Sequence, residues 1–260
     1  EHSFHLLGVL GQVTRQMKLD IQAVCHKGLV RENNEDAVSV GGLFLRDDST
    51  SLVVNTPDDG FFYLLVSDGM GGHEAGEEAS YFTLDELKEQ FALHEIRPDT
   101  FEDDIREAAH YISYKLNGFA AERGQQYPMG CTLTGVVWHY GRVWLVGAGD
   151  SRTYRLRGGL LRQLTTDETE RGLTGDPNAD KRLLNCLGGG TQGHLSVEDI
   201  TGKLSEGDTL LICSDGLTDM VSDDELEQAL SDGASATDLL FRACQAGGAD
   251  NISIILAKIL

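Results

Sequence analysis

The sequence predicts an α+β layered fold. Probable strands occupy both ends of the chain, and two long amphipathic helices lie between them in the first half. Runs of strands and runs of helices, rather than strict alternation of single elements, are typical of this class. No internal repeat or linker-like stretch interrupts the 260 residues. We therefore expect one domain that spans residues 1–260.

The first elements are short strands. Residues 21–25 and 37–40 are rich in β-formers and are bounded by Gly and charged residues. Residues 61–66 are almost continuously apolar, which indicates a central strand that is covered on both faces. Residues 1–18 are expected to form an N-terminal extension or an extra strand.

Two helices follow the break at Gly69 to Gly76. In the first helix, apolar residues recur at helical spacing at Phe82, Leu84, Leu87 and Phe91. Pro98 is expected to end this helix. In the second, Thr100 is the expected N-cap. Its predicted buried stripe comprises Ile105, Ala108, Ala109, Ile112 and Leu116.

Beyond Cys131 the pattern predicts hairpins. Residues 132–139 and 143–147 flank Tyr140-Gly141-Arg142, and residues 153–157 and 160–164 flank Gly158-Gly159. A long polar segment, residues 165–193, follows; we call it the flap. A connection of this length is usually functional.

The flap and the C-terminal part carry the remaining elements. One helical piece is predicted inside the flap at residues 181–186. The later elements are a buried strand at 209–213, helices at 224–230 and 237–246, and a closing strand at 252–259.

The composition restricts the function. The net charge of −21 argues against nucleic acid or an anionic membrane as a partner, because both favour positive surfaces. No apolar run is long enough to span a membrane, and no signal peptide opens the sequence. The five cysteines include no Cys-x-x-Cys pair, which argues against zinc and fits reduced thiols in the cytoplasm.

Four short acidic motifs recur at the ends of predicted strands. They are Arg31–Asp36 (Arg-Glu-Asn-Asn-Glu-Asp), Ser67–His73 (Ser-Asp-Gly-Met-Gly-Gly-His), Cys213–Gly216 (Cys-Ser-Asp-Gly) and Asp250-Asn251. Hard divalent cations take oxygen ligands, and a pair of them needs several carboxylates. An arginine adds a planar fork that suits phosphate. The alternative is that these aspartates only form turns and that Arg31 is a surface residue.

In their order, spacing and residue identity, these motifs resemble those of the PPM family, the metal-dependent, type 2C-like serine/threonine protein phosphatases, in its bacterial form. Gly147–Arg152 (Gly-Ala-Gly-Asp-Ser-Arg) and Ser214–Asp219 (Ser-Asp-Gly-Leu-Thr-Asp) match as well. The resemblance implies a four-layer α-β-β-α sandwich with two central, mainly antiparallel sheets. It also implies a dinuclear metal site at one edge.

The resemblance implies a role for each matched residue. Asp68 would bridge two Mn²⁺ or Mg²⁺ ions, and the others would complete the shell: Glu35, the Gly69 carbonyl, Asp215 and Asp250. Asp36 would orient this shell, and Arg31 would bind the substrate phosphate. A hydroxide that bridges the ions would attack phosphorus directly.

A third, weaker ion is also implied. Asp150 and Asp219 match family positions that hold it beside the pair. Mutual repulsion of carboxylates near Asp215 favours a cation there, and the alternative is that Asp150 only anchors a turn.

The chain departs from the family pattern at two places. Met70 stands where many relatives have a histidine that is proposed as the general acid. His73 could act as an acid or cap the next helix. Asp167-Glu168-Thr169 stands where Asp-His-Ser is common, which affects the entrance to the flap.

The predicted function is therefore hydrolysis of phosphoserine and phosphothreonine in proteins. The expected partners are such phosphoproteins and a Hanks-type kinase, which the enzyme would oppose as a cytoplasmic monomer. The alternative is a pseudophosphatase or partner-switch regulator that keeps the fold as a binding module.

Overall fold

The computed structural model describes residues 16–71, 74–93, 96–124, 128–176 and 178–260. Most of the expected N-terminal extension, residues 1–15, lies outside the described residues, as does His73. The first described strand, β1, begins at Lys18.

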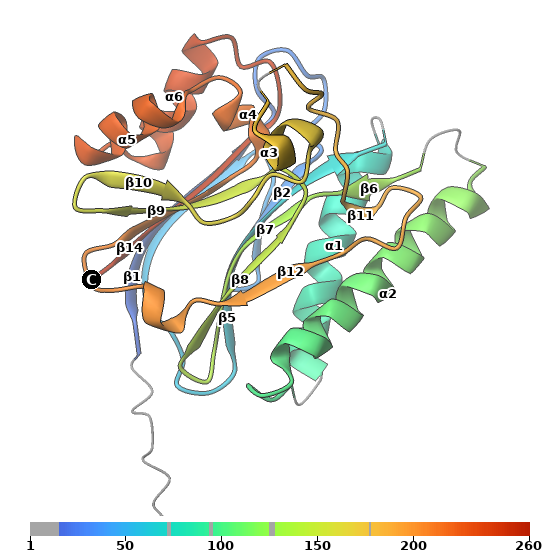
Figure 1. Ribbon diagram of the computed structural model, residues 1–260, viewed down its shortest axis with the longest axis horizontal. Coiled ribbons are helices and arrows are strands. Elements are labelled where there is room, and N and C mark those ends of the chain that lie inside the picture. Colours follow the sequence, from blue (N-terminus) through green and yellow to red (C-terminus); the bar gives the residue numbers. More distant parts are fainter. Residues whose placement is uncertain (1–15, 72–73, 94–95, 125–127, 177) are drawn as a thin grey trace, which may run out of the picture.

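One sheet joins the two ends of the chain (Figure 1). Among the described residues its strands are, in order across the sheet, β10 (Leu160–Gln163), β9 (Arg152–Arg157), β13 (Thr209–Cys213), β14 (Ile252–Ile259), β1 (Lys18–His26) and β4 (Asp48–Asn55). Neighbouring strands in this order are antiparallel. We call this the terminal sheet.

A second sheet packs against it, and we call it the middle sheet. Its order among the described residues is β11 (Leu187–Gly188), β6 (Gly130–Cys131), β5 (Phe61–Met70), β7 (Leu133–His139), β8 (Arg142–Ala148) and β12 (Ser196–Asp199). β2 (Asp36–Val40) also pairs with β5 and with β3 (Leu43–Leu45). These pairs are antiparallel too.

Helices cover the outer faces of both sheets (Figure 1). The long helices α1 (Glu74–Leu93) and α2 (Phe101–Glu122) lie on the middle sheet, whereas α4 (Asp215–Thr218), α5 (Asp223–Ser231) and α6 (Ala236–Gln245) lie on the terminal sheet. A short helix, α3 (Glu170–Thr174), belongs to the flap, and a single 3-10 turn spans Thr201–Lys203. The predicted α+β sandwich is confirmed.

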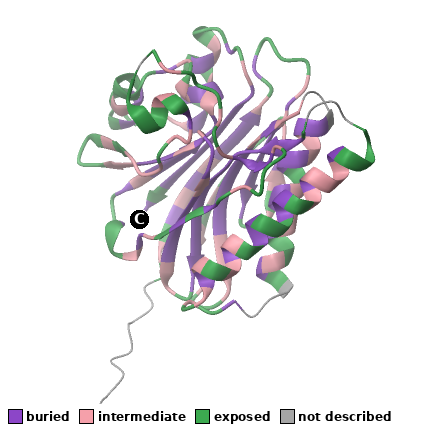
Figure 2. Ribbon diagram, turned by 45° about the vertical axis from the view of Figure 1, so that its right-hand side comes forward, coloured by how far each residue is buried: buried purple, intermediate pink, exposed green. Residues whose placement is uncertain are grey.

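Among the described residues, three hydrophobic clusters separate the four layers. One lies between α1, α2 and the middle sheet, the second between the two sheets, and the third between the terminal sheet and α4–α6. Figure 2 shows the strands as the most buried part of the molecule. The strands are thereby held by apolar packing on one or both faces.

The predicted faces of the long helices are confirmed. Leu84, Leu87 and Phe91 of α1 are buried, Phe82 is partly buried against the same cluster, and the whole predicted stripe of α2 is buried. Thr100 is the N-cap of α2, but its hydroxyl donates to Asp104 Oδ2 at 2.7 Å instead of accepting a backbone N–H. The predicted hairpins and C-terminal helices form with ends shifted by about one residue.

Several regions differ from the sequence prediction: β6, α3, β11, β12 and α4 form where no element was predicted. The helix predicted at residues 181–186 is wrong: Leu184 N–H instead donates to the Glu168 carbonyl at 2.8 Å, and residue 183 bridges to Thr169. Residues 43–55, whose pattern predicts no element, form β3 and β4. β4 is an edge strand that stays largely exposed, so it lacks a strong apolar alternation.

None of the described helices is both long and apolar enough to span a bilayer.

Candidate active site

The candidate residues converge where strands of both sheets end. Asp36 opens β2 and pairs directly with Asp68 of β5 in the antiparallel register. Asp215 lies two residues after the end of β13, and Asp250 lies two residues before the start of β14. Asp150 lies in the turn between β8 and β9. Motifs that are far apart in sequence therefore meet at one end of the sandwich.

Asp68 and Asp215 bring the two sheets together at this end. Their carboxyl groups lie within hydrogen-bonding distance of each other. Burial raises the pKa of Asp68 well above its usual value, and the neighbouring Asp36 and Asp215 add to the increase. Burial also raises the pKa of Asp215, although the hydrogen bond with Asp68 acts to lower it. Such a pair is stable only with a proton or a cation between the carboxylates.

Asp36 is fully buried beneath this pair. Its Oδ2 accepts a hydrogen bond from the Ser214 hydroxyl at 2.7 Å. Burial raises the pKa of Asp36 to about 7. Ser214 precedes Asp215, so this bond joins the start of β2 to the segment that carries Asp215.

Glu35 is held between β5 and the first turn of α1. Its carbonyl accepts hydrogen bonds from Gly69 N–H at 3.1 Å and from the Ser80 hydroxyl at 2.6 Å. A Cβ at Gly76 would lie 1.9 Å from Glu35 Oε2, so the carboxylate occupies space that only a glycine leaves open.

Asn251 fastens the loop that carries Arg31 and Glu35. Its Oδ1 accepts the Glu35 N–H at 2.8 Å, and its Nδ2 donates to the carbonyls of Lys27 and Asn33, each at 2.9 Å. The sequence prediction assigned no role to Asn251. Its place beside Asp250, in a buried position before a strand, was the available signal.

Arg31 faces Asp250. Its guanidinium lies 2.5 Å from Asp250 Oδ2, and half of its side chain is exposed. Arginine has five N–H donors, so this contact leaves others that can bind two oxygens of an oxyanion from solvent.

A cavity of about 540 Å³ adjoins the site on the flap side. Asp150, Asp215 and Asp219 line it, together with Arg171 and Lys181 from the flap. Lys181 forms an ion pair with Asp219. Burial raises the pKa of Asp150 to about 7, and Asp215 adds to the increase.

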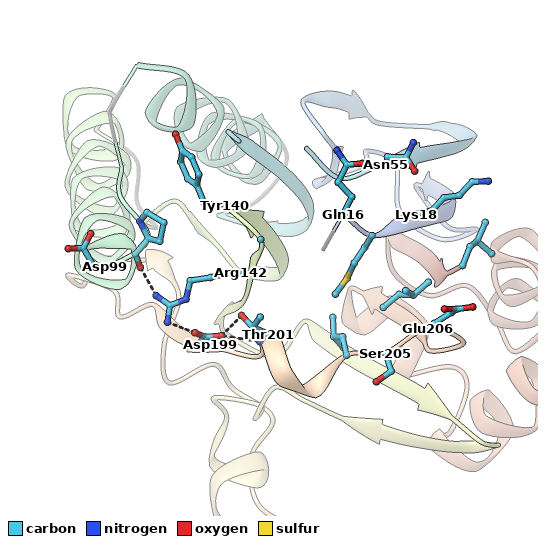
Figure 3. A pocket seen from close by; sticks show the side chains of 16 residues that line it. Gln16, Lys18, Asn55, Asp99, Tyr140, Arg142, Asp199, Thr201, Ser205 and Glu206 are labelled. Atoms are coloured by element: carbon cyan, nitrogen blue, oxygen red, sulfur yellow. Dashed lines mark hydrogen bonds and ion pairs between the residues drawn. The ribbon is translucent and has the colours of Figure 1, made fainter. Parts of the chain in front are cut away.

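A larger cavity of about 1000 Å³ lies at the opposite ends of the same strands (Figure 3). At this cavity Arg142 donates to the Pro98 carbonyl at 2.8 Å and forms an ion pair with Asp199 at 2.6 Å. Asp199 also accepts from Thr201. None of the predicted site residues lines this cavity.

The cysteines do not form a nucleophilic site. Cys25, Cys131, Cys186 and Cys213 are buried. Burial raises the pKa of the Cys25 and Cys186 thiols to about 12 and that of Cys131 to about 11. Thiols with such values are protonated at neutral pH and unreactive.

The carboxylate and carbonyl oxygens at this site suit a hard divalent cation. The described residues nevertheless contain no closed cluster of three or more His, Cys, Asp or Glu side chains that could hold one. Two predicted ligands are paired with basic side chains instead, Asp250 with Arg31 and Asp219 with Lys181. In the part of the chain that is described, Oδ1 of Asp36 and Oδ1 of Asp215 are buried without a hydrogen-bond partner. All candidate ligand atoms are oxygens, as Mg²⁺ and Mn²⁺ require.

Comparison with known proteins gives one consistent result. A sequence profile described as "Protein phosphatase 2C" matches residues 40–260. The serine/threonine phosphatase stp of Listeria monocytogenes is 31% identical over 251 residues, which cover 89% of this chain and 92% of that protein. The structure of the Mycobacterium tuberculosis serine/threonine phosphatase PstP/Ppp is similar with a TM-score of 0.73 and 29% identity, over 93% of this chain and 99% of that one. A structure of the PstP catalytic domain in complex with two manganese ions has the same TM-score and 30% identity, over 94% and 99%.

Proposed function

The chain belongs to the protein phosphatase 2C family, and from this premise we propose how it acts as a metal-dependent protein serine/threonine phosphatase. One observation carries the proposal: Asp68 and Asp215, from different sheets, meet beside an exposed Arg31 at a single edge. Carboxylates in contact supply a site for cations, and the adjacent guanidinium supplies one for phosphate.

We assign the metal-binding role to oxygen donors from both sheets. They are Glu35, Asp68, the Gly69 carbonyl, Asp215 and Asp250. These donors would hold Mn²⁺ or Mg²⁺, which when bound would lower the pKa of a coordinated water and neutralise charge on the phosphoryl oxygens. Asp150 and Asp219 are proposed to hold a weaker third ion.

The remaining steps belong to the chain itself. Arg31 orients the phosphoryl group with its free N–H donors and stabilises the charge that spreads over the equatorial oxygens. Asp36, fixed by Ser214, orients the donors around it. Asn251 holds the loop of Arg31 and Glu35 in place. The buried, protonated thiols take no part.

We also propose the setting in which the enzyme works. Residues 1–260 form one catalytic domain, and the counterpart is a Hanks-type serine/threonine kinase, because Arg31 and a long flap are typical of relatives that oppose such kinases. The free thiols support a cytoplasmic location. The net charge of −21 supports a monomer, because copies of the chain repel each other.

The test is metal-dependent turnover of p-nitrophenyl phosphate and of a phosphothreonine peptide. A chelator should abolish activity, and Mn²⁺ should restore it. Asp215→Asn should lower kcat by roughly a hundredfold or more, because even residues outside the ligand shell cost 10- to 100-fold. The variant should unfold at the same temperature as the wild type in chelator.

Asp224→Asn, an exposed position on α5, is the matched control and should stay fully active. Full activity of Asp215→Asn, or of the wild type in chelator, contradicts the metal assignment. A folded wild type that binds Mn²⁺ and phosphopeptide without turnover would instead identify a binding module.

A further inference from the structure

The flap contacts Asp219 directly and holds the backbone turn next to Asp150, the other residue of the proposed third-ion site. Its Lys181 forms an ion pair with Asp219 at the end of α4. Its Glu168 binds both backbone polar groups of Gly149, the residue before Asp150. The Glu168 carboxylate accepts the Gly149 N–H at 2.8 Å, and the Glu168 N–H donates to the Gly149 carbonyl at 2.9 Å. Neither contact follows from the motifs.

The Glu168 contacts fix the turn that presents Asp150. Gly149 has φ of +100°, and a Cβ there would lie 2.8 Å from Thr132 Cγ2, so only glycine fits this turn and the Glu168 contacts hold its otherwise permissive backbone. The carboxylate of Glu168 is itself held, because Asn185 Nδ2 donates to the same oxygen at 2.6 Å.

Hydrogen bonds of the next two residues, Ser151 and Arg152, also hold this turn in place. Ser151 Oγ lies 2.7 Å from Thr132 Oγ1, and the guanidinium of Arg152 binds Asp167 at 2.6 to 3.0 Å. Asp167 and Glu168 are consecutive. The first residues of the flap therefore hold the Asp150 turn on both sides.

Lys181 acts on Asp219 differently. Its ammonium group is a compact positive charge that occupies the carboxylate to which a divalent cation would bind. Both side chains are about half exposed, so the pair is weak and can exchange. A cation that enters at Asp219 must displace Lys181.

We propose that the flap sets the affinity of the third-ion site through these two residues, which act in opposite directions. Glu168 strengthens cation binding because it fixes the turn of Asp150, and Lys181 weakens it because it competes for Asp219. The inference rests on the proposed function and concerns only the third ion, which we propose is the most weakly bound.

The experiment is a calorimetric Mn²⁺ titration of the full chain. Glu168→Ala should weaken the low-affinity phase about tenfold, the scale of one to two lost hydrogen bonds. Glu168→Gln keeps an acceptor oxygen and should stay within about twofold of wild type, which separates positioning from charge. Lys181→Met should tighten the same phase about two- to fivefold, whereas Lys181→Arg should leave it unchanged. The high-affinity phase should not move.

Two controls remove comparable charges elsewhere. Glu170→Ala removes an exposed acid from the flap helix α3, and Lys203→Met breaks the surface ion pair with Glu198. Both should titrate like wild type, and thermal unfolding confirms that each variant is folded.

The outcomes are distinct. A shift of both variants in the same direction, or none in either, overturns the inference. A wild type that turns over substrate but lacks the low-affinity phase also overturns it, and the phosphatase function stands. A wild type without any metal-dependent turnover removes the proposed function itself.

Discussion

At the scale of single residues, the pairing of Arg31 with Asp250 links the proposed phosphate ligand to a proposed metal ligand. The pair is partly exposed, so it contributes little to stability. The pair instead positions the guanidinium: it stays beside the carboxylates while about half of the Arg31 side chain remains exposed.

Arg31→Ala should raise KM for phosphopeptides about 10- to 100-fold, because a charge-assisted bond of about 1.5 to 3 kcal/mol is lost. Calorimetric Mn²⁺ binding should persist, since the guanidinium is not a metal ligand. Arg31→Lys should recover part of the affinity. Loss of Mn²⁺ binding in Arg31→Ala would place Arg31 in the structural support of the metals instead.

His139 gives a residue-scale prediction remote from the site. It is buried, and its ring stacks on Phe61 with centroids 3.8 Å apart. Burial lowers the pKa of His139, against hydrogen bonds to the Gly60 and Ile96 carbonyls that act to raise it. The folded state therefore binds a proton less readily than the unfolded state, whose ordinary value is about 6.5.

The stability that this residue contributes is present above pH of about 6.5 and is lost as the pH falls through the folded-state pKa. Urea unfolding should be measured at pH 7.5 and at pH 5.5. The free energy of unfolding should decrease less between these two pH values for His139→Gln than for wild type. An equal decrease in the two proteins would mean that other groups account for the acid sensitivity.

At the scale of elements, the first turn of α1 and the loop before β2 fit together only because of a glycine. Gly76 leaves room for the Glu35 carboxylate, and Gly69 lies against the Gly76 carbonyl, 2.0 Å from where its Cβ would be. The helix start and the strand end thus constrain where Glu35 can lie.

Gly76→Ala should displace the Glu35 carboxylate and weaken Mn²⁺ binding about tenfold or more. Unfolding stability should change little, because the clash with the Glu35 side chain offsets the gain of about 0.5–1 kcal/mol that alanine brings to a helix. Calorimetry and urea unfolding measure the two effects.

Gly118→Ala is the matched control, since no atom lies within 4 Å of a Cβ at that position of α2. It should be stabilised by about 0.5–1 kcal/mol and keep its Mn²⁺ affinity. Unchanged Mn²⁺ affinity in Gly76→Ala would exclude Glu35 from the metal site.

At the scale of the whole molecule, the packing between the sheets positions the site. Asp68 belongs to the middle sheet and Asp215 follows a strand of the terminal sheet, so their contact depends on the apolar layer between the sheets. Leu64 and Ile212 are fully buried in that layer.

Leu64→Ala should destabilise the protein by about 2–5 kcal/mol, because a fully buried leucine leaves a cavity. Leu160→Ala, at an exposed hairpin position, should stay within about 0.5 kcal/mol. Urea unfolding with an unchanged m-value measures both. Equal losses would show that the layer between the sheets does not dominate stability.

Much of this protein could be predicted from its sequence. Continuous apolar runs and helical spacing predicted the long elements, because each pattern is local and strong. The motifs predicted which residues would meet, and the structure brings Asp36, Asp68 and Asp215 together. The metal-ligand roles of Asp68 and Asp215, and the orienting role of Asp36, stay predictions.

Only the tertiary structure decided the rest. The edge strand β4 forms because β1 offers it hydrogen bonds, and residues 181–186 are not helical because Leu184 pairs with Glu168. The bonds of Asn251 and Glu168 join residues whose partners lie elsewhere in the sequence. Such contacts depend on which backbone groups the packed sheets leave available, and no local pattern of residues encodes that.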